Sequence, residues 1–156
     1  MNEQNIRRIV EDTVAAASKT ITLARAERLC DAVLEEASRM GVRAVVCVSD
    51  SAGNPKIVKV ADDAYIASYD VALNKAFTVV ALKMSTRKLA TLAQPGGELY
   101  GIQFTNGGRI VIFGGGDPLV DRNGRVLGGL GVSGGSEAQD AALSEFGKRY
   151  FETKML

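Results

Sequence analysis

The sequence predicts an α+β domain, in which helices flank an antiparallel sheet. Three observations lead to this prediction: helical periodicity near both ends of the chain, a hairpin pattern at residues 43–60, and a glycine-rich pair of strands around the turn D-R-N-G at 121–124. The expected order is α-α-β-β-α-β-β-β-α, and tight turns between successive strands favour antiparallel pairing. A chain of 156 residues, 46% hydrophobic and 24% charged, suits one globular module.

Two helices are expected before the first strand. Residues 3–17 carry apolar side chains at 3-4-3 spacing, with charged residues on the other side. The stretch S-K-T-I-T interrupts the pattern, and a second helix is expected from Thr22 as N-cap to Gly41 as the residue that stops it. The first helix is therefore separable, with residues 1–19 as helix and linker and residues 20–156 as the domain.

The middle of the chain predicts a hairpin followed by a long helix. R-A-V-V-C-V-S-D is a valine-rich run of strand length, S-A-G-N-P is typical of a turn, and K-I-V-K-V alternates. Residues 62–84 form a helical pattern that is apolar on more than one side. We expect the sheet to cover one side of this helix and another chain or element to cover the other.

The last part of the chain predicts an irregular stretch, three strands and a helix. Residues 86–108 read as a short helical turn and then a loop rich in glycine, the natural site for the rim of a pocket. Strands are expected at 109–116, at 118–120 and at 125–134. Ser136 and Gln139 have the spacing of a capping box for the final helix.

Composition excludes several classes of function. The net charge is +1 and no basic run exceeds two residues, so we expect neither nucleic acid nor a membrane surface as a partner. The absence of histidine excludes Ser-His and Cys-His catalysis and any zinc site that needs imidazole. Cys30 and Cys47 lie in apolar patterns and are expected to be buried, reduced thiols. No apolar run reaches the ~20 residues of a membrane span, and the N-terminal stretch is amphipathic, so a cytoplasmic location is expected.

The glycines of residues 114–135 raise the question of a phosphate site, because 129–134 spell G-x-G-x-x-G. A dinucleotide fingerprint needs a further strand after the helix that follows, and the sequence has none. An anion at the backbone N–H groups of 134–137 stays an alternative. The preferred interpretation is steric: glycines 114–116 and 128–131 form a floor without side chains, which either a ligand or the long helix covers.

A few polar residues are candidates for chemistry. Lys75 lies within the apolar helix and must find a partner, either in a structural ion pair or as an anchor for a ligand. Thr86 and Arg87 offer a hydroxyl and a cation for a carboxylate, and Ser133 offers a second hydroxyl. Asp50, Asp62 and Asp117 are more easily explained as turn or cap residues.

Several motifs together resemble the GlcG/HbpS haem-degrading family, which includes the C-terminal domain of PduO-type proteins. The motifs are V-S-D-S-A-G-N-P, A-S-Y-D-V-A-L-N-K-A, G-G-G-D-P and G-V-S-G. The resemblance implies a five-stranded antiparallel sheet flanked by helices, in profilin-like α-β-α layers, and a homo-oligomer. It also implies haem or tetrapyrrole binding, although without histidine the iron could be held only by tyrosine, methionine, cysteine or an oxygen ligand. The chain departs from the family at 60–64, where V-A-D-D-A replaces an arginine-led stretch.

The sequence therefore predicts a small-ligand-binding accessory protein. The expected ligand-binding residues are Asp50, Lys75, Thr86, Arg87, Gly115, Gly116, Pro118, Ser133 and Gly134, with no metal site and with catalytic residues unassigned. Two alternatives stay open. One is an enzyme that acts on a small hydroxy or oxo acid with Lys75 as base or Schiff-base donor. The other is a purely structural oligomeric partner protein.

The N-terminal helix has a resemblance of its own. M-N-E-Q-N-I-R-R-I-V-E-D-T-V-A-A followed by S-K-T is similar to the encapsulation peptides that dock enzymes inside bacterial microcompartments. This resemblance implies contact with a shell protein through residues 2–17, by the apolar stripe of the helix. The alternative is a helix that packs on its own domain or on a neighbouring subunit.

Overall fold

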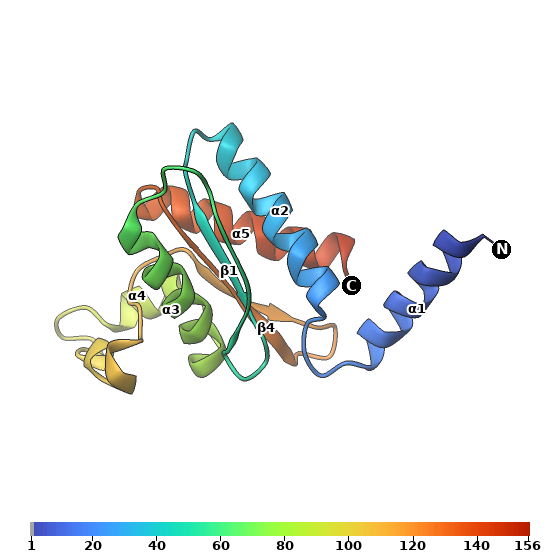
Figure 1. Cartoon of the computed structure of the whole chain (residues 1–156). Helices are drawn as coiled ribbons and strands as arrows, with labels where there is room; N and C mark the ends of the chain where they lie inside the picture. Colours follow the sequence, from blue (N-terminus) through green and yellow to red (C-terminus); the bar gives the residue numbers. More distant parts are fainter. Residues whose placement is uncertain (1) are drawn as a thin grey trace.

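The computed structural model describes residues 2–156 and has three layers, with the sheet in the middle (Figure 1). Helices α2 (Leu23–Arg39) and α5 (Glu137–Lys154) cover one face of the sheet. Helix α3 (Ile66–Leu82) covers the other face, and the short α4 (Thr86–Leu92) follows it. This arrangement confirms the predicted α+β class with helices on both faces of an antiparallel sheet.

The sheet has four strands in the order β2-β1-β4-β3, and all neighbours are antiparallel. The strands are β1 (Val45–Ser49), β2 (Pro55–Val60), β3 (Gly116–Val120) and β4 (Val126–Ser133). The predicted hairpin at 43–60 is present as β1 and β2, and the turn at 121–124 joins β3 to β4. Both prolines within strands lie on edge strands, where a missing N–H is tolerated.

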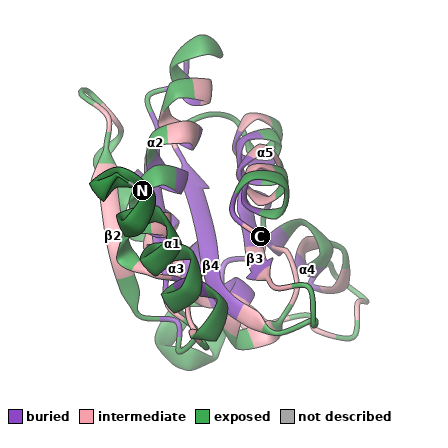
Figure 2. Ribbon diagram, turned by 90° about the vertical axis from the view of Figure 1, so that its right-hand side faces the viewer, coloured by how far each residue is buried: buried purple, intermediate pink, exposed green. Residues whose placement is uncertain are grey.

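The core follows from the alternation of side chains along the central strands. Every residue of β1 is buried, and Figure 2 shows β4 as a continuous buried band. Val46 and Val48 contribute to the core with α2 and α5, whereas Val45 and Cys47 contact α3. Because side chains alternate with period two along a strand, each central strand supplies both layers.

The strand predicted at residues 109–116 is wrong over residues 109–113, and only its last residue, Gly116, lies in a strand, as the first residue of β3. The backbone there is held by a helix side chain: Thr78 Oγ1 accepts from Val111 N at 3.0 Å. The hydroxyl donates to Asn74 O within α3 at 2.7 Å and also lies 3.3 Å from Arg109 O. Ile110 and Val111 are buried, so the apolar run packs as an irregular segment. The five-stranded sheet implied by the resemblance is corrected to four strands for the same reason.

The predicted helix ends are largely confirmed. Thr22 Oγ1 accepts from Arg25 N, and Ser136 and Gln139 form the expected capping box of α5. Gly41 has φ +70°, the left-handed conformation that ends α2. The long helix begins at Ile66 with Tyr65 as N-cap, so the predicted start at residue 62 is four residues too early.

Helix α1 (Glu3–Ala17) projects from the body of the molecule and leads into α2 through the stretch at 18–22 (Figure 1). Its N-cap is Asn2, whose side chain accepts from Asn5 N at 2.9 Å. Ala15 near its end is buried, whereas the rest of the helix is exposed, as Figure 2 shows by colour.

Candidate functional site

The glycine floor predicted at 114–116 and 128–131 is formed in part, and α3 covers Gly116, Gly129 and Gly131, whereas Gly128 faces Ser49 and Ile21. Gly116 of β3 lies opposite Gly131 of β4, and Gly129 lies two residues before it on the same face. A Cβ atom on Gly131 would lie 2.7 Å from Ala76 N, and one on Gly129 would lie 2.7 Å from Val79 Cγ2. Such distances are impossible for real side chains, so the backbones of α3 and β4 are closer than any other residue would allow.

Two alternatives were left open for what covers these glycines, a ligand or the long helix. The structure shows that the long helix covers them. The helix contributes small side chains at the contact, with Ala72 and Ala76 one turn apart and both fully buried. Glycines on the strand and alanines on the helix let the two elements approach. A ligand would have to displace α3 to reach this surface.

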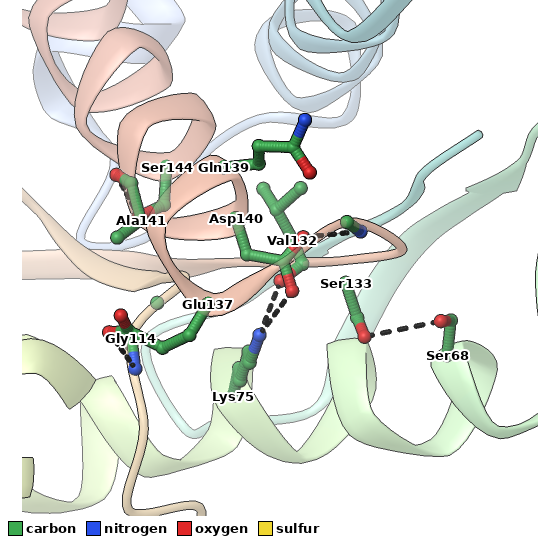
Figure 3. A network of polar contacts seen from close by, with 12 residues as sticks. Ser68, Lys75, Gly114, Val132, Ser133, Glu137, Gln139, Asp140, Ala141 and Ser144 are labelled. Atoms are coloured by element: carbon green, nitrogen blue, oxygen red, sulfur yellow. Dashed lines mark hydrogen bonds and ion pairs between the residues drawn. The ribbon is translucent and has the colours of Figure 1, made fainter. Parts of the chain in front are cut away.

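Lys75 lies at the edge of the same contact and has no exposed surface. Its ammonium group donates to Asp140 Oδ2 at 3.0 Å and to the carbonyl of Val132 at 2.8 Å, as Figure 3 shows. The ring of Phe113 lies 5.0 Å from Nζ. The structural ion pair, one of the two roles expected for Lys75, is present, and its carboxylate comes from the first turns of α5.

This ion pair joins a wider network of polar contacts between α5, β4 and the loop before β3 (Figure 3). The second carboxylate oxygen of Asp140 accepts from Gly135 N at 2.9 Å. Glu137 Oε1 accepts from Gly114 N at 3.0 Å. Gly115 has φ +114°, and a Cβ atom there would lie 2.5 Å from Lys75 Nζ, so both its conformation and the space require glycine.

Burial lowers the pKa of Lys75, and the nearby Asp140 carboxylate raises it again. Burial likewise raises the pKa of Asp140, against the effect of the Lys75 charge. Each group therefore depends on the other to stay charged. An amine in this position has no contact with solvent, and a substrate would have to separate it from Asp140 before the Schiff-base or base chemistry considered above.

The other predicted ligand residues do not form one site. Thr86 is buried and its Oγ1 accepts from Gly116 N at 2.9 Å, which fixes the start of β3. Ser133 donates to Ser68 Oγ at 3.3 Å. Asp50 accepts from Ala52 N and Asn54 N and shapes the turn between β1 and β2. Of the remaining four, Gly116 and Pro118 lie on β3, Gly134 borders a hollow beside Tyr65, and Arg87 is exposed on α4.

The hollow beside Tyr65 has a volume of about 320 Å³. Arg43 and Asp63 face each other across 3.7 Å at its edge, and Gly134, Gly135 and Gln139 line it from the other side. Tyr65 is 75% exposed, Ile66 is 96% exposed and Tyr69 is 49% exposed. We call these three residues the α3 surface. It corresponds to the second apolar side expected for the long helix, and no element of residues 2–156 covers Ile66.

A second polar cluster was missed by sequence reasoning. Asp117 was interpreted as a turn or cap residue in preference to a chemical role, yet its side chain is buried and accepts from Ser144 Oγ at 2.7 Å. Burial raises the pKa of this carboxyl group. Ser144 and Lys148 are one turn apart on α5 and, with Asp117, border the same small hollow. The i, i+4 spacing of Ser144 and Lys148 was the feature of the sequence that could have indicated this polar cluster.

The described part of the chain offers few ligands for a metal. From residue 2 onward, no group of three His, Cys, Asp or Glu side chains is placed to hold an ion. Cys30 and Cys47 are buried free thiols whose pKa values burial raises to about 12. No helix in residues 2–156 has the length and apolar character needed to cross a membrane.

Comparison with protein families gives one family match, over residues 21–148, to the model described as "Haem degrading protein HbpS-like". An uncharacterized 15.0 kDa protein from the dhaT–dhaS intergenic region of Citrobacter freundii is 46% identical over 126 residues, which are 81% of this chain and 88% of that protein. The corrinoid adenosyltransferase PduO of Salmonella typhimurium is 39% identical over 118 residues. The match covers 76% of this chain but only 35% of PduO.

Solved structures show the same fold. The Klebsiella pneumoniae protein ORFY is 42% identical with a TM-score of 0.80, and the match covers 84% of this chain and 90% of ORFY. A complex described as PduOC with haem is 35% identical with a TM-score of 0.78, and the match covers 83% of this chain and 94% of that one. A double mutant of HbpS from Streptomyces reticuli is 28% identical with a TM-score of 0.76, covering 85% and 87%.

Proposed function

Because the chain belongs to the HbpS-like family, we propose that it is an accessory protein that binds haem or a related tetrapyrrole and acts as a homo-oligomer. The PduOC structure with haem supports this proposal, since it shares 35% of its sequence with this chain over nearly its whole length. The adenosyltransferase activity named for PduO is not part of the proposal, because this chain spans about a third of that enzyme.

The residues of this chain restrict how the iron of a haem would be held. There is no histidine, and the two cysteines are buried in the core with protonated thiols. A tyrosine phenolate is an established haem ligand in other proteins. Tyr65 and Tyr69 are the exposed tyrosines of the α3 surface, one turn apart, and Ile66 supplies apolar contact beside them.

The α3 surface is the single observation on which this proposal depends. It combines exposed phenol groups, an exposed aliphatic side chain and, at the edge of the adjoining hollow, the guanidinium of Arg43. A cation there suits a propionate group, which is a carboxylate. The hollow is open on the solvent side, so a second copy of the chain would complete the enclosure of a bound tetrapyrrole, which links ligand binding to oligomerisation.

We expect haem titration to give a Soret band that depends on one of these tyrosines. Either Tyr65→Phe or Tyr69→Phe should weaken haem binding by about tenfold or more and change the visible spectrum, because phenylalanine cannot ligate iron. Tyr100→Phe is the matched control, since Tyr100 is 65% exposed and lies outside the α3 surface. The proposal is wrong if the wild-type protein gives no Soret shift, or if all three variants bind haem as it does.

A second part of the proposal concerns α1, which we propose docks the protein to a microcompartment shell. Four apolar side chains of α1 lie at helical spacing and are about half exposed, from 46% to 55%. They form a stripe that the body of the molecule does not cover: Ile6, Ile9, Val10 and Val14. An exposed apolar stripe of this kind is what a partner's groove recognises in helix docking.

Residues 1–19 fused to a fluorescent protein are expected to copurify with intact shells. Replacing Ile9 and Val10 by aspartate should abolish copurification, because charges on the stripe are costly to bury. Replacing Arg8 and Glu11 by alanine is the control, since both lie on the polar side of α1. Equal recovery of the two variant fusions, or no recovery of the parent fusion, would contradict docking through this stripe.

A further inference from the structure

A small hollow lies where α4, β3 and α5 meet, and neither the α3 surface nor the hollow beside Tyr65 shares a residue with it. Its volume is about 160 Å³. We call it the Asp117 hollow, and the residues that line it are Ser85, Arg87, Asp117, Ala141, Ser144, Glu145 and Lys148. Ligand sites for drug-sized molecules have volumes of roughly 300 to 1,000 Å³, so only a small molecule fits here.

The floor of the hollow is Asp117, a residue that is 9% exposed. One of its oxygens accepts from Ser144 Oγ, and Ser144 is the only side-chain donor to this carboxylate among residues 2–156. The strand holds the residue in place, because Asp117 pairs with Leu130 in the register of β3 and β4. The other carboxylate oxygen accepts no side-chain hydrogen bond within residues 2–156. A carboxylate that is largely removed from water and has such an oxygen favours a ligand that brings a hydrogen-bond donor.

The rim of the hollow is cationic on two sides. Burial raises the pKa of Asp117, and the charges of Lys148 of α5 and Arg87 of α4 lower it, whereas the Glu145 carboxylate, which also lines the hollow, raises it. Arg87 has only a loose partner, since its guanidinium is 4.0 Å from the carboxylate of Glu145. Two cations at the mouth of a small hollow favour an anionic group, and a guanidinium binds a carboxylate with two parallel hydrogen bonds.

We propose that the Asp117 hollow binds a small carboxylic acid that carries a hydroxyl or amino group on the neighbouring carbon. Arg87 and Lys148 hold the acid group at the mouth, and the donor on the neighbouring carbon reaches the Asp117 carboxylate at the floor. The hydroxyls of Ser85 and Ser144 complete a polar lining. This site is separate from the α3 surface, so it does not depend on the proposed binding of haem.

The test uses the haem-free full chain and follows backbone amide signals by NMR during titration with lactate, alanine and acetate. Acetate has the acid group but no neighbouring donor. We expect lactate or alanine to shift the signals of Ala141 and Ser144 and to bind about tenfold more tightly than acetate. The proposal is overturned if acetate binds as tightly as lactate and alanine do, or if the signals that shift belong to residues away from the Asp117 hollow. It is also overturned if none of the three acids binds at concentrations up to about 50 mM.

Two variants test which residue contacts the acid group of the ligand and which contacts its hydroxyl or amino group. Arg87→Gln should weaken binding by about tenfold, because a charged hydrogen-bond donor is replaced by a neutral one. Arg149→Gln is the control, since Arg149 is exposed on α5 and does not line the hollow. Asp117→Asn should weaken the binding of alanine much more than the binding of lactate. An amide oxygen can accept a hydrogen bond from the lactate hydroxyl, but it does not neutralise the ammonium group of alanine. Equal binding by Arg87→Gln and Arg149→Gln overturns the proposal whether or not Asp117→Asn folds.

Discussion

Replacing Gly131 by valine is expected to cost about 4 kcal/mol or more in the free energy of unfolding, which is a large part of the roughly 5 to 15 kcal/mol that stabilises an ordinary domain. The first side-chain atom of valine would overlap the backbone of α3, with Ala76 N only 2.7 Å away. A backbone atom cannot rotate aside as a side chain does, so α3 would have to move off the sheet as a unit. That movement would open the core formed by Val45, Cys47, Ala72 and Ala76.

Urea unfolding followed by circular dichroism measures this effect, and Gly124→Ala is its control. Gly124 lies in the turn between β3 and β4, where a Cβ atom meets nothing within 4 Å, but its φ is +80°. Gly124→Ala should therefore lower the free energy of unfolding only through backbone strain, by about 1 kcal/mol. Similar unfolding midpoints for Gly131→Val and Gly124→Ala would mean that α3 does not rest on β4 as closely as described.

The glycine pattern shows what the sequence can predict and where it stops. The proximity of glycines 114–116 to glycines 128–131 was predicted, because the turn at 121–124 closes a hairpin between them, and the structure pairs Gly116 with Gly131. What would cover the glycines did not follow, since bare backbone suits a helix and a ligand equally well. The deciding signal was on the helix, where Ala72 and Ala76 form a small-residue face one turn long.

The error at residues 109–113 has a similar origin. A short apolar run has the same appearance in a buried strand and in a buried irregular segment. The backbone N–H of Val111 in this run donates to Thr78, a residue of α3 that is more than thirty positions earlier in the sequence. Local periodicity carries no information about such a partner, whereas the capping box at Ser136 is local and was predicted correctly.

In the candidate site too, residues that can be identified from their sequence neighbours differ from partners that only the fold brings together. Lys75 was identified because a charge within an apolar helix needs a partner, and that argument uses only its neighbours in the sequence. Its partner Asp140 is 65 residues away on α5, and the sequence neighbours of Lys75 carry no information about it. Asp117 and Ser144 were not connected at all, because their hydrogen bond forms only when α5 packs beside β3.

Removing either charge of the Lys75 and Asp140 pair is expected to destabilise the fold by about 3 to 5 kcal/mol, because the other charge would be left buried without a partner. Lys75→Met keeps the length of the side chain and removes the ammonium group, and Asp140→Asn keeps the shape of the carboxylate. Thermal unfolding of both variants measures the cost. Lys59→Met is the control, since Lys59 pairs with Asp31 at the surface, and we expect little change there.

The double variant Lys75→Met with Asp140→Asn separates the value of the pair from the cost of breaking it. If the ion pair itself contributes little, the double variant should be more stable than Lys75→Met alone, because no unpaired charge is then buried. The amide of asparagine can still accept from Gly135 N, so the turn before α5 keeps that contact. Val132 O loses its donor in both variants, and this common loss cancels in the comparison. A double variant that is less stable than Lys75→Met would instead mean that Asp140 stabilises the start of α5 independently of Lys75.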